Sequence, residues 1–232
     1  MSLFQDFRGS GMAGRSAARR AGTKQRQLGF SILELTVVVS IMVTVLAVAV
    51  PSATSITRNY RIAGDARVTS AELNLARMRA AADFTHARVY MNLSANTFHL
   101  EIWNKTSACW QTDGDTNACT VAGSPVISLG VSDTFGFGTL TTGPTAATST
   151  IAQAPACTVG VAGAAPGSTI ANTACIEFNS RGYPVKSTNA IVANDAIYMM
   201  NSNQNLYAGV AVSISGQPTA YSYKGSSTWA QF

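Results

Sequence analysis

The chain has 232 residues, enough for one ordinary domain with attached segments. Hydrophobic residues make up 47% of it and charged residues 12%, which excludes an intrinsically disordered protein and argues against a charge-rich cytosolic surface. The formal net charge of +5 would suit a nucleic-acid partner, but residues 1–29 hold six of the basic residues and one acidic residue. The rest of the chain has ten basic and ten acidic residues, so without those 29 residues the protein is neutral.

A long apolar segment follows the basic block. Residues 30–50 read FSILELTVVVSIMVTVLAVAV, with Glu34 as the only charge. As a helix these residues extend about 31 Å, the thickness of the hydrocarbon core of a bilayer. The basic residues before the segment predict a cytoplasmic N-terminus and place the residues after Pro51 outside the cytoplasm. Small residues after the segment, in VAVPSATS, leave open a cleaved signal peptide.

Glu34 distinguishes this segment from an ordinary signal anchor. A carboxylate at the centre of a spanning helix costs about 2.5–3.5 kcal/mol, and a simple signal segment gains nothing from it. We therefore expect Glu34 to need a partner of opposite charge.

The residues around Gly29 and Phe30 carry a resemblance to a known family. The run KQRQLG followed by FSILELTVVVSIMVTVLAVAVP is similar to the processing site of type IV pilins and of the pseudopilins of type II secretion. The resemblance implies that a prepilin peptidase cuts after Gly29, that Phe30 becomes an N-methylated N-terminus, and that the apolar helix is retained. Glu34 then occupies the fifth position of the mature chain. Our hypothesis is that Glu34 pairs with the α-ammonium group of Phe30 on a neighbouring subunit, so that both charges are neutralised in a filament.

Residues 51–84 predict an amphipathic continuation of the helix. Pro51 marks either a kink or the end of the first helix, and the two readings stay open. Small and apolar residues then recur at steps of three and four, which indicates one buried face: Ile62, Ala66, Thr69, Leu73, Ala76 and Ala80. The arginines between them favour a solvated or subunit-facing surface over phosphate contacts: Arg58, Arg61, Arg67, Arg77 and Arg79.

Residues 85–232 predict a β-rich domain outside the cytoplasm. Residues 89–93 and 98–102 alternate around a short polar connection with an asparagine, which predicts a β-hairpin. Residues 175–178, 196–200, 209–214 and 219–223 predict further antiparallel strands that close the sheet. The expected fold class is α+β, with a long N-terminal hydrophobic helix packed on an antiparallel β-sheet domain that has long irregular loops.

Two segments of this domain resemble a particular branch of the family. IEFNSRGYPV at residues 176–185 and YAGVAVSISGQP at residues 207–218 are similar to strand and turn signatures of the GspH/FimT (FimU-like) minor pilins and pseudopilins. The resemblance implies a minor filament subunit.

Residues 106–174 are rich in Ser, Thr, Gly, Ala and Pro and predict a long irregular excursion with a few edge strands. Asp113 and Asp115 are too few carboxylates for a calcium cage. His86 and His99 lack a cysteine or carboxylate at metal-ligand spacing. We expect no metal and no cofactor.

The four cysteines all follow the apolar segment. They are Cys109, Cys119, Cys157 and Cys175, and in an oxidising compartment an even count indicates two disulfides. Of the three connectivities we prefer pairing between sequence neighbours, with free buried thiols as the alternative.

The chain shows no nucleophile elbow, phosphate loop, dinucleotide fingerprint or zinc-protease motif, so we expect no enzymatic activity. The leading function is a minor pilin or pseudopilin, a structural subunit of a type IV pilus or type II secretion pseudopilus, with an assembly-initiating or tip-associated role. Its partners would be a prepilin peptidase and other pilins. The subunit would lie first in the inner membrane, with its C-terminal domain in the periplasm, and later in the filament. The alternatives are a signal-anchored periplasmic protein or a FimT-like DNA-uptake pilin. Lys224 is the only basic residue from Ser187 onward, so we expect weak DNA binding.

Overall fold

The computed structural model describes residues 31–115, 119, 126–144, 150–164, 166–192, 195–201, 205–224 and 228–232. The chain divides into two compact units, Met1–Val48 and Ala49–Phe232.

A single helix, α1 (Ile32–Ala82), runs through the boundary between the units and has 51 residues. It continues through Pro51, so the alternative in which the first helix ends at this proline is wrong. Proline lacks an amide hydrogen, so the carbonyl of Ala47 loses its usual helical donor at this point. A kink at Pro51 stays a prediction.

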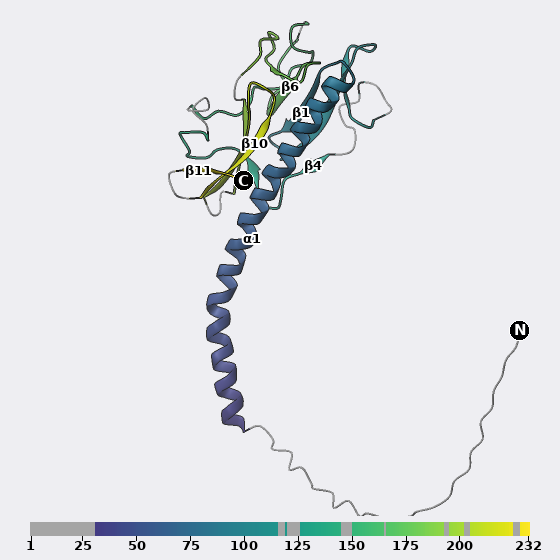
Figure 1. Cartoon of the computed structure of the whole chain (residues 1–232). Coiled ribbons are helices and arrows are strands. Elements are labelled where there is room, and N and C mark those ends of the chain that lie inside the picture. Colours follow the sequence, from purple (N-terminus) through teal and green to yellow (C-terminus); the bar gives the residue numbers. More distant parts are fainter. Residues whose placement is uncertain are drawn as a thin grey trace, which may run out of the picture. The chain divides into compact units, whose positions relative to one another are not determined.

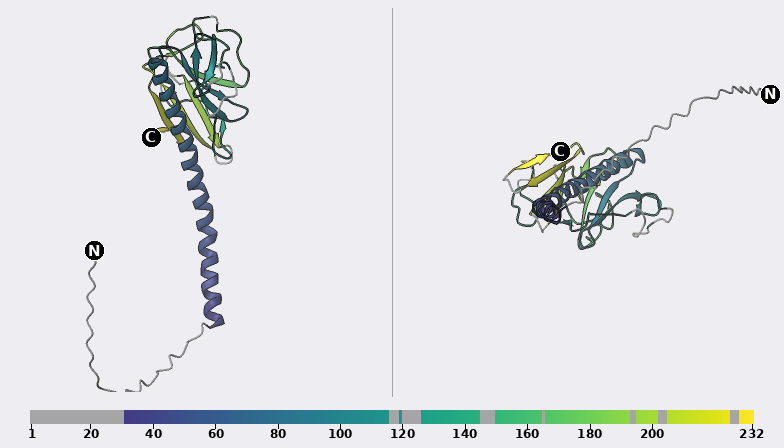
Figure 2. Two further views of the ribbon diagram at one scale, coloured as in Figure 1. Left: turned by 90° about the vertical axis from the view of Figure 1, so that its right-hand side faces the viewer. Right: turned by 90° about the horizontal axis from the view of Figure 1, so that it is seen from below.

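The β-strands form two antiparallel sheets beside the C-terminal half of α1 (Figures 1 and 2). The first sheet has the order β3-β2-β1-β6-β7, with β4 also paired to β2. Its strands are β1 (Ala87–Asn92), β2 (Thr97–Asn104), β3 (Cys109–Thr112), β4 (Ile127–Ser128), β6 (Thr173–Phe178) and β7 (Pro184–Val185).

The second sheet has the order β11-β10-β9-β8-β5. Its strands are β5 (Thr134–Phe135), β8 (Ala196–Asn201), β9 (Leu206–Val212), β10 (Pro218–Lys224) and β11 (Trp229–Gln231). The prediction that the C-terminal strands close a single sheet is wrong. No strand of the second sheet pairs with a strand of the first in the described part of the chain, and α1 packs against both.

The predicted hairpin is confirmed in β1 and β2, where Met91 lies opposite Phe98 and Val89 opposite Leu100. Its turn forms because the Asn92 side-chain oxygen accepts the backbone amides of Ser94 (3.1 Å) and Ala95 (2.9 Å). The alternation of β1 and β2 therefore sends one set of side chains toward α1 and the other set to the outer face of the first sheet.

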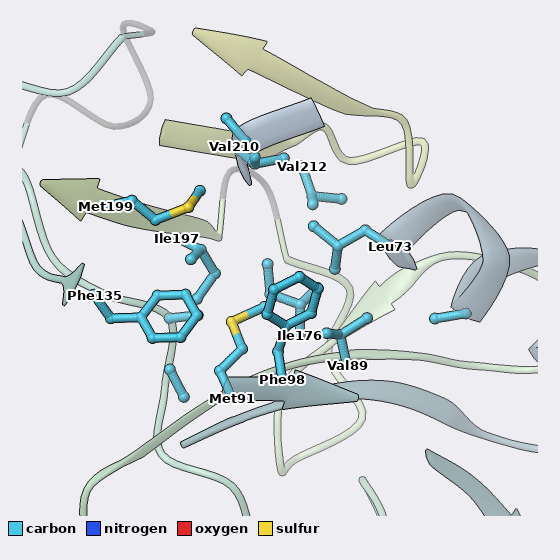
Figure 3. Close-up of a cluster of buried hydrophobic side chains, with 14 of the residues drawn as sticks. Leu73, Val89, Met91, Phe98, Phe135, Ile176, Ile197, Met199, Val210 and Val212 are labelled. Carbon is cyan, nitrogen blue, oxygen red and sulfur yellow. The ribbon is translucent and has the colours of Figure 1, made fainter. Parts of the chain in front are cut away.

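One hydrophobic core joins the helix to both sheets (Figure 3). The residues of α1 buried in it are those of the predicted stripe: Ile62, Ala66, Thr69, Leu73, Ala76 and Ala80. Leu73 is fully buried and belongs to the same cluster as Val89 and Ile176 of the first sheet and Val210 and Val212 of the second. This arrangement confirms the α+β fold class, and in the described residues between β3 and β6 the only strands are the short β4 and β5.

Candidate functional site

The candidate site is the part of α1 before Pro51, which exposes an apolar surface on all sides. None of its residues is buried, and its large apolar side chains range from 42% exposed at Val38 to 83% at Ile32. By length and composition α1 is able to cross a membrane. A helix that is apolar all round needs a lipid or protein environment, since exposed apolar surface of this extent is unfavourable in water.

The polar side chains of this segment, apart from Glu34, are satisfied within the helix. The hydroxyls of Thr36, Ser40 and Thr44 donate to the carbonyls of Leu33 (2.9 Å), Thr36 (2.8 Å) and Ile41 (2.8 Å). These internal bonds let the segment enter an apolar environment without unpaired hydroxyl groups.

Glu34 is the exception. It lies in the first turn of α1, where a carboxylate interacts favourably with the positive end of the helix dipole. Within the residues that the structure describes, Glu34 has neither a hydrogen-bond nor an ion-pair partner. Its carboxylate is thus free to bind a cation from another molecule. Gly29 and Phe30, the predicted cleavage site, lie outside the described residues.

The arginines of α1 beyond Pro51 do more than face solvent. Arg61 Nη1 donates to the carbonyl of Val131 (2.9 Å), and Arg77 Nη1 donates to Gln217 Oε1 (3.3 Å). Arg79 Nη2 lies 3.1 Å from Asp113 Oδ2, and the Arg67 guanidinium lies 4.9 Å from the centre of the Phe232 ring. Four of the five arginines therefore contact the β-domain, and three of these four, Arg61, Arg67 and Arg79, are also exposed to solvent, as expected.

The outer face of the first sheet contains a buried ionic cluster that the sequence analysis did not identify. Arg88 Nε donates to Glu101 Oε2 over 2.6 Å, and the two side chains are 3% and 2% exposed. Arg88 also donates to the carbonyl of Thr158 (2.6 Å) and lies 4.0 Å from the centre of the Trp110 ring. His99 Nε2 lies 3.2 Å from Glu101 Oε1.

The environment of this pair favours the ionised form of Glu101. Burial alone would raise the pKa of Glu101, but the hydrogen bonds from His99 and Arg88 and the charge of Arg88 hold its pKa below the usual value. Burial lowers the pKa of Arg88, and Glu101 opposes that effect. Both side chains are almost completely buried and bonded to each other, although Arg88 also lines a pocket with Lys186 and Asp195, so the geometry of the pair indicates a structural role.

The second histidine is also bonded to a carboxylate. His86 Nδ1 lies 2.7 Å from Glu177 Oε1, which accepts the backbone amide of Ala162 (2.9 Å). Among the described residues, no group of three His, Cys, Asp or Glu side chains is placed to hold a metal ion. Asp113 pairs with Arg79, so it does not extend a carboxylate cage with Asp115.

Both disulfides join sequence neighbours, the preferred connectivity: Cys109 with Cys119, and Cys157 with Cys175. The second bond ties the segment around Cys157 to β6, and this segment covers the buried Arg88. Each disulfide therefore ties a cysteine outside the strands to a strand, Cys119 to β3 and Cys157 to β6.

The aromatic side chains of the C-terminal strands pack on one another. The rings of Tyr223 and Trp229 lie 5.4 Å apart between centres, and those of Tyr198 and Trp229 lie 5.9 Å apart. Trp229 Nε1 donates to the carbonyl of Thr142 (2.9 Å). These contacts give the rings a packing role in the second sheet.

No protein-family model matches the chain, and no curated protein matches it. Among solved structures, the chain is similar to the minor pseudopilin EpsH from the Type 2 Secretion System of Vibrio cholerae. The match has 9% sequence identity and a TM-score of 0.39, and it covers 74% of this chain and 96% of that chain. A similarity this distant indicates neither the family nor the function of this chain.

Proposed function

We propose that the chain is a minor pilin or pseudopilin, a structural subunit of a type IV pilus or a type II secretion pseudopilus. A prepilin peptidase cuts after Gly29 and methylates Phe30, and the mature subunit waits in the inner membrane with its β-domain in the periplasm. The subunit then enters a filament through α1, in an assembly-initiating or tip-associated position.

The observation that supports this proposal most strongly is the single unpaired carboxylate on an exposed apolar helix. Glu34 has no partner within the described residues, while the hydroxyls of Thr36, Ser40 and Thr44 are satisfied by their own helix. A lone carboxylate in such a segment is costly unless a second charge accompanies it into the apolar environment. The α-ammonium group of Phe30 on a neighbouring subunit is a cation of the right kind, because cleavage after Gly29 creates it.

The position of the helix in the fold supports the same role. Beyond Pro51, α1 is built into the β-domain by its buried stripe and by its arginines, whereas before Pro51 every described residue is exposed. Helix–helix contact between subunits would cover that exposed surface. The chain after residue 29 has as many acidic as basic residues, and Lys224 is its only basic residue from Ser187 onward, so we do not propose DNA binding.

Substitution of Glu34 tests the proposed pairing. The full chain would be expressed with the pilins and the prepilin peptidase of a host that builds such filaments, and its presence in sheared filaments would be measured by immunoblot. We expect Glu34→Gln and Glu34→Ala to lower incorporation at least tenfold, and Glu34→Asp to retain part of it. Asp83→Asn, at an exposed carboxylate just after α1, is the matched control and should be incorporated normally. Undiminished incorporation of Glu34→Ala would refute the pairing.

A further inference from the structure

The segment between β4 and β5, residues 129–133, crosses from the first sheet to the second. β4 pairs with β2 in the first sheet, and β5 pairs with β8 in the second. Two hydrogen bonds hold this crossover on α1: the Gly130 amide donates to Asp65 Oδ2 (2.8 Å), and Arg61 donates to the carbonyl of Val131 (2.9 Å). The crossover therefore connects the helix with both sheets.

A second carboxyl group, that of Asp133, lies beside Asp65 at this point. Asp133 is 3% exposed, and its Oδ1 accepts the side-chain amide of Asn201 over 2.7 Å. The other oxygen, Asp133 Oδ2, is buried and receives no hydrogen bond from the described residues, while the Asp65 carboxyl lies within hydrogen-bonding reach of Asp133. Two carboxylates this close repel each other when both are ionised.

We propose that Asp65 and Asp133 share one proton and act as a pH-dependent latch that holds the 129–133 crossover on α1. The proton lies between the two carboxyl groups and gives Asp133 Oδ2 the donor that it otherwise lacks. When the proton leaves, two adjacent negative charges face each other, with Arg61 as the cation on the helix side and the neutral Asn201 on the β8 side.

The electrostatic environment places the change near pH 6. Burial, together with the nearby charge of Asp133, raises the pKa of Asp65 to about 6, although the Gly130 hydrogen bond and Arg61 oppose this. Burial likewise raises the pKa of Asp133 above its ordinary value. Since the pair titrates as a unit, its apparent pKa belongs to both groups.

The sign of the effect follows from these directions. A carboxyl group with a folded pKa of about 6 and an ordinary value of 3.8 holds its proton more tightly in the folded state. Its contribution to stability is complete at a pH below the ordinary pKa of 3.8 and declines as the pH rises through about 6. With a folded pKa of about 6 and an ordinary pKa of 3.8, the equilibrium constant for closing the latch falls by at most about tenfold between about pH 5 and about pH 7.5. Solvent screening makes the change smaller than this.

Hydrogen exchange of the full chain in detergent micelles tests the latch. Amide protection of residues 129–133 would be compared at about pH 5 and about pH 7.5, after correction for the intrinsic exchange rate. In the wild type we expect protection to fall several-fold at the higher pH. In Asp65→Asn the new amide keeps an oxygen for Gly130 and donates permanently to Asp133 Oδ2, so protection should be equal at both pH values.

Two further variants control this experiment. Asp195→Asn changes another partly buried carboxyl group with a raised pKa, away from the crossover, and should keep the wild-type pH dependence. If Asp65→Asn does not fold, Asp133→Asn should abolish the pH dependence in its place, because its amide donates to Asp65. Protection of the wild type that does not change with pH would overturn the latch, as would an Asp65→Asn profile like that of the wild type. The latch would also be overturned if amide protection at pH 7.5 required added calcium, because the two carboxylates would then hold a cation and not a shared proton.

Discussion

Removal of Arg88 should be among the most destabilising single substitutions in the β-domain. Arg88→Met leaves the Glu101 carboxyl group, 2% exposed, without its guanidinium partner, and His99 is the hydrogen-bond partner that remains to it among the described residues. The substitution also removes the donor to the Thr158 carbonyl and the cation above the Trp110 ring. Breaking a buried ion pair by removing one partner costs about 3–5 kcal/mol, so we expect the free energy of unfolding to fall by that amount.

Urea unfolding of the disulfide-intact chain in micelles, followed by tryptophan fluorescence, measures this loss. Arg79→Met is the matched control, because it breaks the ion pair between Arg79 and Asp113, whose side chains are 45% and 23% exposed. This substitution should lower the free energy of unfolding by about 1 kcal/mol or less. The double variant Arg88→Met/Glu101→Leu, which leaves no charge unpaired, should recover much of the loss. An Arg88→Met protein within 1 kcal/mol of the wild type would refute the structural role of the pair.

Two further substitutions test the loops and turns. Cys157→Ser, compared with the disulfide-intact wild type, should lower the free energy of unfolding by about 3 kcal/mol in the same urea assay, because the Cys157–Cys175 bond closes a loop with a sequence separation of 18. Gly216→Ala should destabilise the domain by about 1–3 kcal/mol, because Gly216 has a φ of +80° and a Cβ there would lie 2.1 Å from the Gly182 carbonyl oxygen. Gly64→Ala is its control: apart from the backbone of its own helix, a Cβ at this position has no atom within 4 Å, so the melting temperature should stay the same or rise. Equal melting temperatures for the two alanine variants would contradict the account of the Gly216 turn.

The helix and the hairpin could be predicted from the sequence because their signals are local. The three- and four-residue spacing from Ile62 to Ala80 depends only on helical geometry, and the alternation from Val89 to Ile102 only on the pleat of a strand. The short strands β7 and β11 were missed, because two or three residues are too few to show a period. The division into two sheets depends on which strands pair, and that is decided by packing on α1.

The ionic cluster was missed for a physical reason. Alternation places Arg88 and Glu101 on the side of β1 and β2 away from the core, and at the edge of a domain this side normally faces water. Here the segment around Thr158, held by the Cys157–Cys175 bond, covers it. The contact joins residues that are 70 apart in sequence, so no local pattern reports it. Glu34, by contrast, is recognisable from sequence because a single charge in a long apolar run needs no tertiary information.

The most direct test of the proposed function is the N-terminus of the mature protein. The full chain would be expressed with and without a prepilin peptidase, and its intact mass and N-terminal sequence would be determined. The account predicts that the peptidase produces a chain that begins at N-methylated Phe30 and still carries the apolar helix. A chain that stays uncleaved in the presence of the peptidase, or that is cut after Val50, would contradict it and make an anchored or secreted protein the better explanation.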